Sequence, residues 1–315
     1  MGNKLLRIAA AAVILGALAL PNILPRFFLH LAIYISIMSI AVIGLGILGV
    51  SGQISCAQGA FFGIGAYTYS LLAIRMGMSF WTSLPFVVLL ACVVGFVVGL
   101  PTIKVSGLYL IMTTLGVNEI VHLIMMNYIA LTGGPQGLSR IPAPSLFGFT
   151  FNTMSSYFYL SYVFLLFFAL LAQRIFRSRL GSFFIAVKNS EIASSMNGVN
   201  VVKTKLTAFV FSAVYGGIAG ALYAGYIGYI HPYNFITDVS ILFLTMAIFG
   251  GQRSVWGMIS AAAFLTIATE YFRFIGDYRH IAYGLVLILG MTYMPDGIGG
   301  MFSQLRNLRK IGKRA

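Results

Sequence analysis

Long apolar segments recur along the whole chain and limit the folds that it can adopt. Each segment approaches the roughly 20 residues that a helix needs to cross the hydrocarbon core of a bilayer. The runs are continuous and lack the alternation of apolar and polar residues that marks the strands of a membrane β-barrel. We predict spans at residues 8–24, 28–49, 58–76, 82–103, 106–129, 157–174, 205–229, 236–252, 255–272 and 280–295. The sequence therefore favours an all-α membrane protein with about ten transmembrane helices in one domain, residues 1–315.

The composition supports this class, because 59% of the residues are hydrophobic and only 8% are charged. Soluble domains carry about 25% charged residues. The first span has an alternative interpretation as a cleaved signal peptide, since Ala17-Leu18-Ala19 is similar to a small-residue cleavage site. We favour a retained span, because the apolar stretch continues and the rest of the chain is also rich in spans.

The basic residues are distributed unevenly over the two sides of the predicted spans. The formal net charge is +14, and in a membrane protein such an excess marks cytoplasmic ends of spans rather than a nucleic-acid site. Fifteen fall on one side, namely Lys4, Arg7, Lys104, Arg174, Arg177, Arg179, Lys188, Lys203, Lys205, Arg253, Arg306, Arg309, Lys310, Lys313 and Arg314. Five fall on the other, namely Arg26, Arg75, Arg140, Arg273 and Arg279. We therefore expect a multi-pass protein with both termini in the cytoplasm and no nucleic acid among its partners.

One connection on the basic side, residues 180–205, is polar between two apolar spans. It contains a short helix-like run at Glu191–Met196, which Ser190 can cap and which Asn197-Gly198 can end through left-handed geometry. A polar, amphipathic loop between spans is typical of contact with a soluble partner. On the other side the longest connection, residues 130–156, is interpreted as an exposed loop, with a docking surface as the alternative.

A second polar stretch, SGQISCAQG at residues 51–59, separates the second and third spans. Polar backbone survives at membrane depth only where protein or a water-filled cavity surrounds it. We favour a re-entrant turn that lines a path over a plain cytoplasmic turn, which makes Gln53 and Gln58 candidate path residues. Small residues that recur on one helix face predict close packing between helices. These packing residues are Gly59, Gly63, Gly216 and Gly220.

An acid and a histidine lie within the fifth predicted span. Glu119 and His122 are three residues apart, a spacing that places two side chains on one face of a helix and lets them pair. A charged side chain at membrane depth normally faces the protein interior. A structural pair that fixes helix packing and a group that lines or gates a translocation path are both open interpretations.

The sequence contains no cluster typical of an enzyme or a metal site. The four histidines lie on different segments, and Cys56 and Cys92 lack metal-ligand spacing. The GxxxxGK[ST] pattern of ATP-binding loops is also missing. We therefore predict a transport protein that is not an enzyme, with no catalytic residue, no metal and no cofactor bound by this chain.

Several stretches taken together resemble one family. They are GQISCAQGAFFGIGAY at 52–67, SGLYLIMTTLGVNEIVHLI at 106–124, LTGGPQGL at 131–138, EIASSMNGVNVVKTKLTAFVFSAVYGGIAGALYA at 191–224, IFGGQRSVWG at 248–257 and YGLVLILGMTYMPDGIGG at 283–300. In order and spacing they resemble the inner-membrane permeases of branched-chain amino acid ABC transporters of the Liv type, closest to the LivM branch. The match covers nearly the whole chain from about residue 30.

The resemblance implies a ten-helix importer subunit of the vitamin B12-importer type (type II) in a bacterial inner membrane. Such a subunit pairs with a homologous permease, two cytoplasmic ATPase subunits and a periplasmic substrate-binding protein. The family also carries a coupling motif, a short cytoplasmic helix that seats in a groove of the ATPase. Glu191, Ala193 and Gly198 occupy its matching positions, so the expected coupling residues are Glu191, Ala193, Ser194 and Gly198.

This sequence also departs from the family pattern. Ser194 stands where alanine is usual, and Cys56-Ala57-Gln58 replaces a more common Leu-Gly-His. Branched-chain or other hydrophobic amino acids are the expected substrates, and urea, short amides or other small organic solutes are the alternative. A secondary transporter that works without ATP, with Glu119 and His122 as a proton relay, is the less favoured mechanism.

Overall fold

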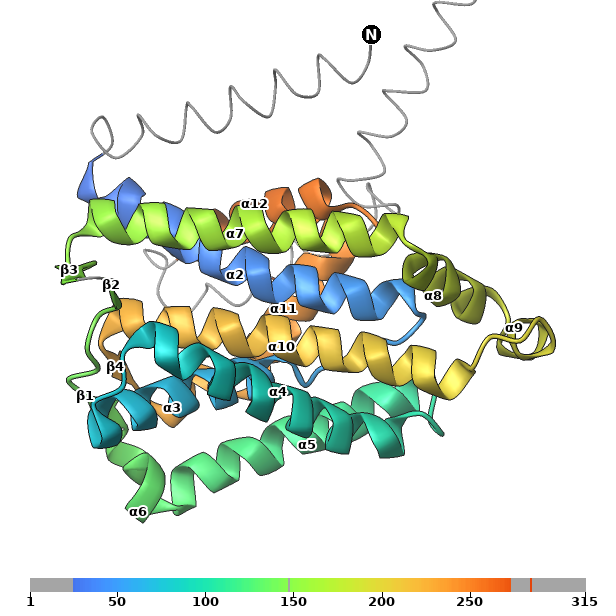
Figure 1. Cartoon of the computed structure of the whole chain (residues 1–315), viewed down its shortest axis with the longest axis horizontal. Helices are drawn as coiled ribbons and strands as arrows, with labels where there is room; N and C mark the ends of the chain where they lie inside the picture. Colours follow the sequence, from blue (N-terminus) through green and yellow to red (C-terminus); the bar gives the residue numbers. More distant parts are fainter. Residues whose placement is uncertain (1–24, 147, 273–283, 285–315) are drawn as a thin grey trace, which may run out of the picture.

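Helix α2 (Arg26–Val50) runs through the middle of a bundle of long helices (Figure 1). The computed structural model describes residues 25–146, 148–272 and 284. The other helices are α3 (Gln58–Met76), α4 (Phe80–Thr102), α5 (Leu108–Asn127), α6 (Ile129–Thr132), α7 (Met154–Arg177), α8 (Arg179–Asn189), α9 (Glu191–Met196), α10 (Val201–Ile227), α11 (Thr237–Gly250) and α12 (Val255–Phe272). Every residue from Ser36 to Ser51 is buried, so α2 is enclosed by its neighbours along most of its length.

The predicted spans between residues 28 and 272 all coincide with long helices. Within the described residues, six segments are long and apolar enough to cross a membrane, namely Arg26–Val50, Phe80–Thr102, Leu108–Asn127, Met154–Arg177, Val201–Ile227 and Pro232–Gly250. Helix α12 is a shorter apolar helix, and α3 carries Gln58 and several small residues. The predicted spans 8–24 and 280–295 lie outside the described residues, with the exception of residue 284. The alternative of a cleaved signal peptide concerns residues that also lie outside them.

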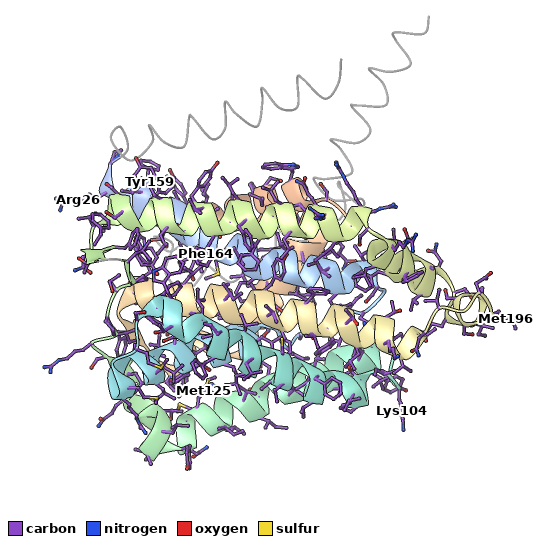
Figure 2. All side chains as sticks on the ribbon, viewed as in Figure 1. Arg26, Lys104, Met125, Tyr159, Phe164 and Met196 are labelled. Atoms are coloured by element: carbon purple, nitrogen blue, oxygen red, sulfur yellow. The ribbon has the colours of Figure 1, made fainter. Side chains whose placement is uncertain are left out.

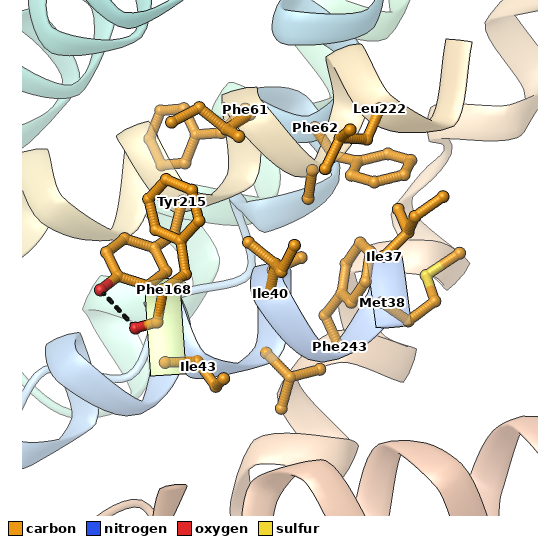
Figure 3. Packing of buried hydrophobic residues seen from close by; sticks show 14 of the residues in the cluster. Ile37, Met38, Ile40, Ile43, Phe61, Phe62, Phe168, Tyr215, Leu222 and Phe243 are labelled. Atoms are coloured by element: carbon orange, nitrogen blue, oxygen red, sulfur yellow. Dashed lines mark hydrogen bonds between the residues drawn. The ribbon is translucent and has the colours of Figure 1, made fainter. Parts of the chain in front are cut away.

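The interior of the bundle is built from large aliphatic and aromatic side chains (Figure 3). From α2, Ile37, Ile40 and Ile43 are fully buried. The Tyr215 hydroxyl on α10 donates a hydrogen bond of 3.0 Å to the carbonyl of Phe168 on α7. This bond satisfies the one polar atom that the tyrosine brings into an apolar region, where an unpaired hydroxyl would be costly.

Helices α3 and α10 approach each other closely because both carry glycine at the contact. A Cβ atom added at Gly65 would overlap the backbone of Gly217, and one added at Gly220 would overlap the carbonyl of Phe62. Gly216 faces the side chain of Gln58 across the same contact. Since lipid tails are as apolar as the helices, close backbone packing of this kind supplies much of the attraction between spans.

The other two predicted packing glycines face different neighbours. A Cβ at Gly63 would crowd Met125 of α5 and Phe235, and one at Gly59 would crowd the Ser240 hydroxyl of α11. Both positions therefore let other elements approach the α3 backbone, on the side away from α10.

The two ends of the bundle differ in structure. At one end, strand β1 (Leu138–Ser139) pairs antiparallel with β4 (Tyr229–Ile230), and β2 (Ser145–Leu146) pairs with β3 (Phe149–Thr150). Two short 3-10 helices, Gly134–Gln136 and Pro232–Phe235, complete these connections. At the opposite end, α8 and α9 extend beyond the long helices (Figure 1).

Most basic residues of the described chain lie at the end that carries α8 and α9, as Figure 2 shows for Lys104. This group consists of Lys104, Arg174, Arg177, Arg179, Lys188, Lys203, Lys205 and Arg253. The strand-bearing end has Arg26, Arg75 and Arg140. The uneven distribution predicted from the sequence is therefore a property of the folded molecule within the part that the structure describes.

The glycine contact between α3 and α10 makes a direct prediction about stability. Alanine at position 220 would place its Cβ against the Phe62 carbonyl, and overpacking of this kind costs about 1–3 kcal/mol. Gly220→Ala should therefore lower the unfolding temperature of the purified chain in detergent. The matched control is Gly116→Ala, because a Cβ at Gly116 meets nothing within 4 Å. The control should unfold at the wild-type temperature or slightly above it, and an equal loss in both variants would contradict the packing account.

Candidate functional site

The stretch between α2 and α3 turns back into the bundle. Gln58, the first residue of α3, donates a hydrogen bond of 2.8 Å to the carbonyl of Ala41, nine residues before the end of α2 at Val50. At the helical rise per residue, the chain has returned by roughly 14 Å along α2. Residues 51–57 are buried apart from Gly52 and Ile54. This segment, which we call the re-entrant segment (residues 51–57), is therefore not a plain turn at the end of the bundle.

The irregular backbone of the re-entrant segment is hydrogen-bonded to side chains of neighbouring helices. The Cys56 amide donates to the Thr114 hydroxyl of α5 at 2.9 Å. The Gly59 amide, in the first turn of α3, donates to the Ser240 hydroxyl of α11 at 2.8 Å. Ser240 in turn donates to the side-chain carbonyl of Asn118 on α5 at 2.9 Å. The start of α3 is thus held by α5 and α11 together.

Gln58 forms a second set of buried hydrogen bonds toward α2 and α10. Its side-chain nitrogen donates to the carbonyls of Ala41 at 2.8 Å and Ser212 at 3.3 Å, and its side-chain oxygen accepts from the Ser212 hydroxyl at 2.9 Å. The residue is 1% exposed. Its amide is therefore committed to joining three helices in this conformation.

Gln53 joins the re-entrant segment to the start of α10. Its side-chain nitrogen donates to the Ser51 hydroxyl at 2.9 Å and to the backbone carbonyl of Lys205 at 3.0 Å. Lys205 then extends its ammonium group to Glu191 of α9, with Nζ and Oε1 2.6 Å apart. One continuous series of polar contacts therefore runs from the buried re-entrant segment to the protruding helix.

Helix α9 has well-formed ends, as the sequence predicted. Ser190 caps its start by accepting a hydrogen bond from the Ala193 amide at 3.2 Å. At its end the Val199 amide donates to the Ser194 carbonyl and the Gly198 amide donates to the Ser195 carbonyl, both at 3.0 Å. This is the Schellman arrangement, which requires a left-handed residue, and Gly198 has a φ of +79°.

Two large apolar side chains of α9 are exposed. Met196 is 83% exposed and Ile192 is 73% exposed, and Met196 marks the tip of the molecule in Figure 2. Ser194 is buried, and its hydroxyl donates to the Ser190 carbonyl at 2.7 Å. The helix thus presents two large apolar side chains to the surroundings on a short, rigid frame.

Glu119 and His122 do not pair, so this expectation from their spacing is wrong. Glu119 is exposed and accepts a hydrogen bond of 3.4 Å from the Thr237 hydroxyl. His122 is 8% exposed, its ring lies 5.7 Å from that of Tyr233, and its Nδ1 has no partner among the described residues. Residues three apart on a helix differ by about 60° in direction, which here puts one side chain outside the bundle and the other inside.

Sequence reasoning singled out His122 on α5 but missed Thr114 and Asn118, which contribute to holding the start of α3. Thr114, Asn118 and His122 recur every four residues on α5 and are all buried. That spacing is a polar stripe along one helix face, and it was available in the sequence. Lys205 and Ser212 carried no such signal, because their partners lie far away along the chain.

A recess of about 440 Å³ opens at the strand-bearing end, between α2, α7 and α10. His30, Tyr157 and Tyr226 line it, and His30 Nδ1 lies 2.6 Å from the Tyr226 hydroxyl. Gln53, Gln58 and Glu119 are not among its lining residues. In the part of the chain that the structure describes, no three His, Cys, Asp or Glu side chains gather as a metal ion would require.

A bundle of long apolar helices, in which one helix starts inside the bundle on hydrogen bonds to its neighbours, is the architecture of a multi-pass membrane protein. The family described as "Branched-chain amino acid transport system / permease component" matches residues 27–294. The chain belongs to this family of permeases.

Relatives within the family share most of the chain length. The chain is 35% identical over 311 residues to the high-affinity branched-chain amino acid transport system permease protein LivM of Escherichia coli (strain K12), covering 91% of this chain and 73% of that protein. It is 27% identical over 290 residues to the permease protein LivH of Salmonella typhimurium, covering 82% and 91%. A probable LivM of Methanocaldococcus jannaschii is 24% identical over 289 residues. No solved structure matches the chain.

The hydrogen bonds of Gln58 predict a non-additive pair of mutations. Gln58→Met leaves the Ser212 hydroxyl without its acceptor, and an unsatisfied buried polar group costs about 1–3 kcal/mol. Ser212→Ala should also lower the unfolding temperature in detergent, because it removes the donor to the Gln58 side-chain oxygen. The double variant should lose less stability than the sum of the two single losses, since partners that contact each other are coupled. Strict additivity would contradict the assigned contact.

Proposed function

We propose that this chain is the permease subunit of an ATP-driven importer for branched-chain or other hydrophobic amino acids. The observation that carries this proposal is α9, a capped helix that protrudes from the bundle and presents Ile192 and Met196 to the surroundings. Two large exposed apolar side chains on a short rigid helix are suited to seating in a groove of a partner protein. An ion-driven carrier has no use for such a helix.

The end of the bundle that carries α9 is proposed to face the cytoplasm. Eight of the eleven basic residues in the described chain lie there, namely Lys104, Arg174, Arg177, Arg179, Lys188, Lys203, Lys205 and Arg253. Basic residues accumulate on the cytoplasmic side of membrane proteins. With an even number of spans, about ten in all, both termini lie on that side as well, and the membrane is a bacterial inner membrane.

The proposed partners follow from this orientation. Two cytoplasmic ATPase subunits supply the hydrolysis of ATP, so this chain is not an enzyme and binds no cofactor. A periplasmic binding protein delivers the solute at the opposite end. The relatives named LivM and LivH are both permease proteins of branched-chain amino acid transport systems, which supports pairing with a second, homologous permease.

The second permease is proposed to pack against the outward face of α5. This face exposes Met112, Gly116, Glu119 and Leu123. A carboxylate at the middle of a span costs about 3 kcal/mol or more when it faces lipid, so such a group normally faces protein or a water-filled path. The translocation path then lies between the two permeases, with Glu119 on its wall.

The alternatives keep less support. Urea, short amides or other small organic solutes are the alternative cargoes of the same machinery, since the binding protein selects the solute. A proton-driven carrier would use Glu119 and His122 as a relay, but their side chains lie on different faces of α5. The relatives are named for branched-chain amino acids, which supports that cargo over the others.

Substitution at the tip of α9 tests the proposed coupling role. Met196→Glu should abolish co-purification with the ATPase subunits and stop ATP-driven leucine uptake into vesicles, because a charge replaces an apolar side chain that docks. It should leave the unfolding temperature unchanged, since Met196 is 83% exposed. The matched control is Met76→Glu at the strand-bearing end, where Met76 is 69% exposed.

The control variant should retain the ATPase subunits. Retention by Met196→Glu as well, together with normal leucine uptake, would refute α9 as the ATPase contact. Loss of the ATPase from both variants would show that any added surface charge disturbs assembly.

Cysteine labelling tests the proposed permease contact. In a background without Cys56 and Cys92, Gly116→Cys on α5 should react with a membrane-soluble maleimide in the isolated chain and be protected in the complete transporter. Leu170→Cys on α7, at a site that is 63% exposed, should react in both. Protection of Leu170→Cys with reaction at Gly116→Cys would move the contact from α5 to α7.

A further inference from the structure

Helix α9 is tied to the bundle by an ion pair that is buried on one side. The Lys205 ammonium lies 2.6 Å from the Glu191 carboxylate. The Lys205 side chain is 7% exposed, whereas that of Glu191 is 50% exposed. The lysine is therefore held inside the protein, and the glutamate carries the contact outward to α9.

The same lysine also contacts the buried re-entrant segment through its backbone. Its carbonyl accepts a hydrogen bond of 3.0 Å from Gln53, which is 4% exposed. Gln53 donates in addition to Ser51, at the point where α2 ends. The side chain of Lys205 thus contacts the protruding helix α9, and its backbone contacts the re-entrant segment.

Helix α8 lies against the same segment from another side. A Cβ at Gly52 would come within 3.2 Å of the Lys188 backbone, and Gly52 has a φ of +82°. The loop formed by α8 and α9 therefore contacts the re-entrant segment by direct packing as well as through Lys205. Packing can push the segment, but only the bonded route through Lys205 can also pull it.

The segment that receives this contact is connected further into the bundle. Its Cys56 amide is bonded to Thr114 on α5, the helix whose outward face carries Glu119. Displacement of the re-entrant segment therefore carries α5 with it unless this hydrogen bond breaks. Packed and hydrogen-bonded elements of this kind move as rigid bodies rather than deform continuously.

We infer that Lys205 is a positioning residue that links movement of α9 to the re-entrant segment, through its ion pair with Glu191 and its carbonyl bond to Gln53. This inference rests on the proposed function, because it assigns the route by which movement of the ATPase reaches the translocation path. The bond from Gln53 is to the backbone carbonyl and persists whatever side chain stands at position 205, so the ion pair with Glu191 is the part of the link that the lysine side chain supplies. Removal of the ammonium group leaves α9 covalently connected to the bundle, but without the ion pair that holds the helix against it.

The test uses the complete transporter in vesicles, with radiolabelled leucine as the probe, and measures leucine moved per ATP hydrolysed. Lys205→Met removes the charge and keeps most of the side-chain length. We expect ATP hydrolysis to persist while the ratio falls by at least about five-fold, the lower end of usual coupling between linked sites. Lys205→Arg should restore the ratio, because it can still pair with Glu191.

The matched control is Lys203→Met, at an exposed lysine two residues away in the first turn of α10. It should keep the wild-type ratio. Glu191→Gln removes the same ion pair from its exposed side and should reproduce the fall in the ratio, which gives a second variant if Lys205→Met does not fold.

The outcomes separate the two proposals. A wild-type transporter that hydrolyses ATP but moves neither leucine nor the other branched-chain and hydrophobic amino acids would refute the proposed function itself. A wild-type transporter that couples normally, with an unchanged ratio in Lys205→Met and Glu191→Gln, would overturn the linkage and leave the function standing. Equal losses of hydrolysis and uptake, with the ratio unchanged, would show a role in assembly alone and would also overturn the linkage.

Discussion

The fold depends on how an interrupted backbone is satisfied inside a bundle of membrane helices. No water is at hand in the hydrocarbon core to bond free amides and carbonyls, so irregular backbone persists there only when protein groups replace the water. Here the hydroxyls of Thr114 and Ser240 accept hydrogen bonds from the amides of Cys56 and Gly59. The side chain of Gln58 forms hydrogen bonds with α2 and α10. Helices α2, α5, α10 and α11 are therefore arranged around the start of α3, and the polar side chains that they contribute there set their relative positions.

Apolar burial alone would not specify this arrangement, because both the packed and the outward surfaces of membrane helices are largely apolar. Specific attraction between the helices comes from close packing and from hydrogen bonds. Glycine at Gly65, Gly217 and Gly220 lets α3 and α10 meet backbone to backbone, while the buried polar groups fix the register of that contact. Helix α9 extends beyond the bundle together with α8 (Figure 1), and Lys205 holds it to the bundle. The molecule thus combines a bundle whose helix contacts are fixed by close packing and hydrogen bonds with a helix, α9, that extends from the bundle and is linked to it.

The sequence predicted those elements well whose limits depend on residues close together in the chain. Apolar length located the spans from 28–49 to 255–272, and the capping residue Ser190 with Gly198 located both ends of α9. Contacts between distant residues were harder. The spacing of Glu119 and His122 suggested a pair, but three residues turn a helix far enough to separate an exposed side chain from a buried one. The stripe formed by Thr114 and Asn118 was visible in principle, whereas the bond from Gln53 to Lys205 joins residues 152 apart and follows only from the packed structure.

The central claim is that the buried start of α3 and the protruding helix α9 move together. Hydrogen–deuterium exchange of the assembled transporter, with and without ADP trapped by vanadate after ATP hydrolysis, measures this most directly, because it reports on the backbone amides of both regions. The account predicts that exchange changes on trapping in the peptides that cover α9 and also in those that cover residues 51–59. A change confined to α9, with residues 51–59 exchanging identically in both states, would contradict it.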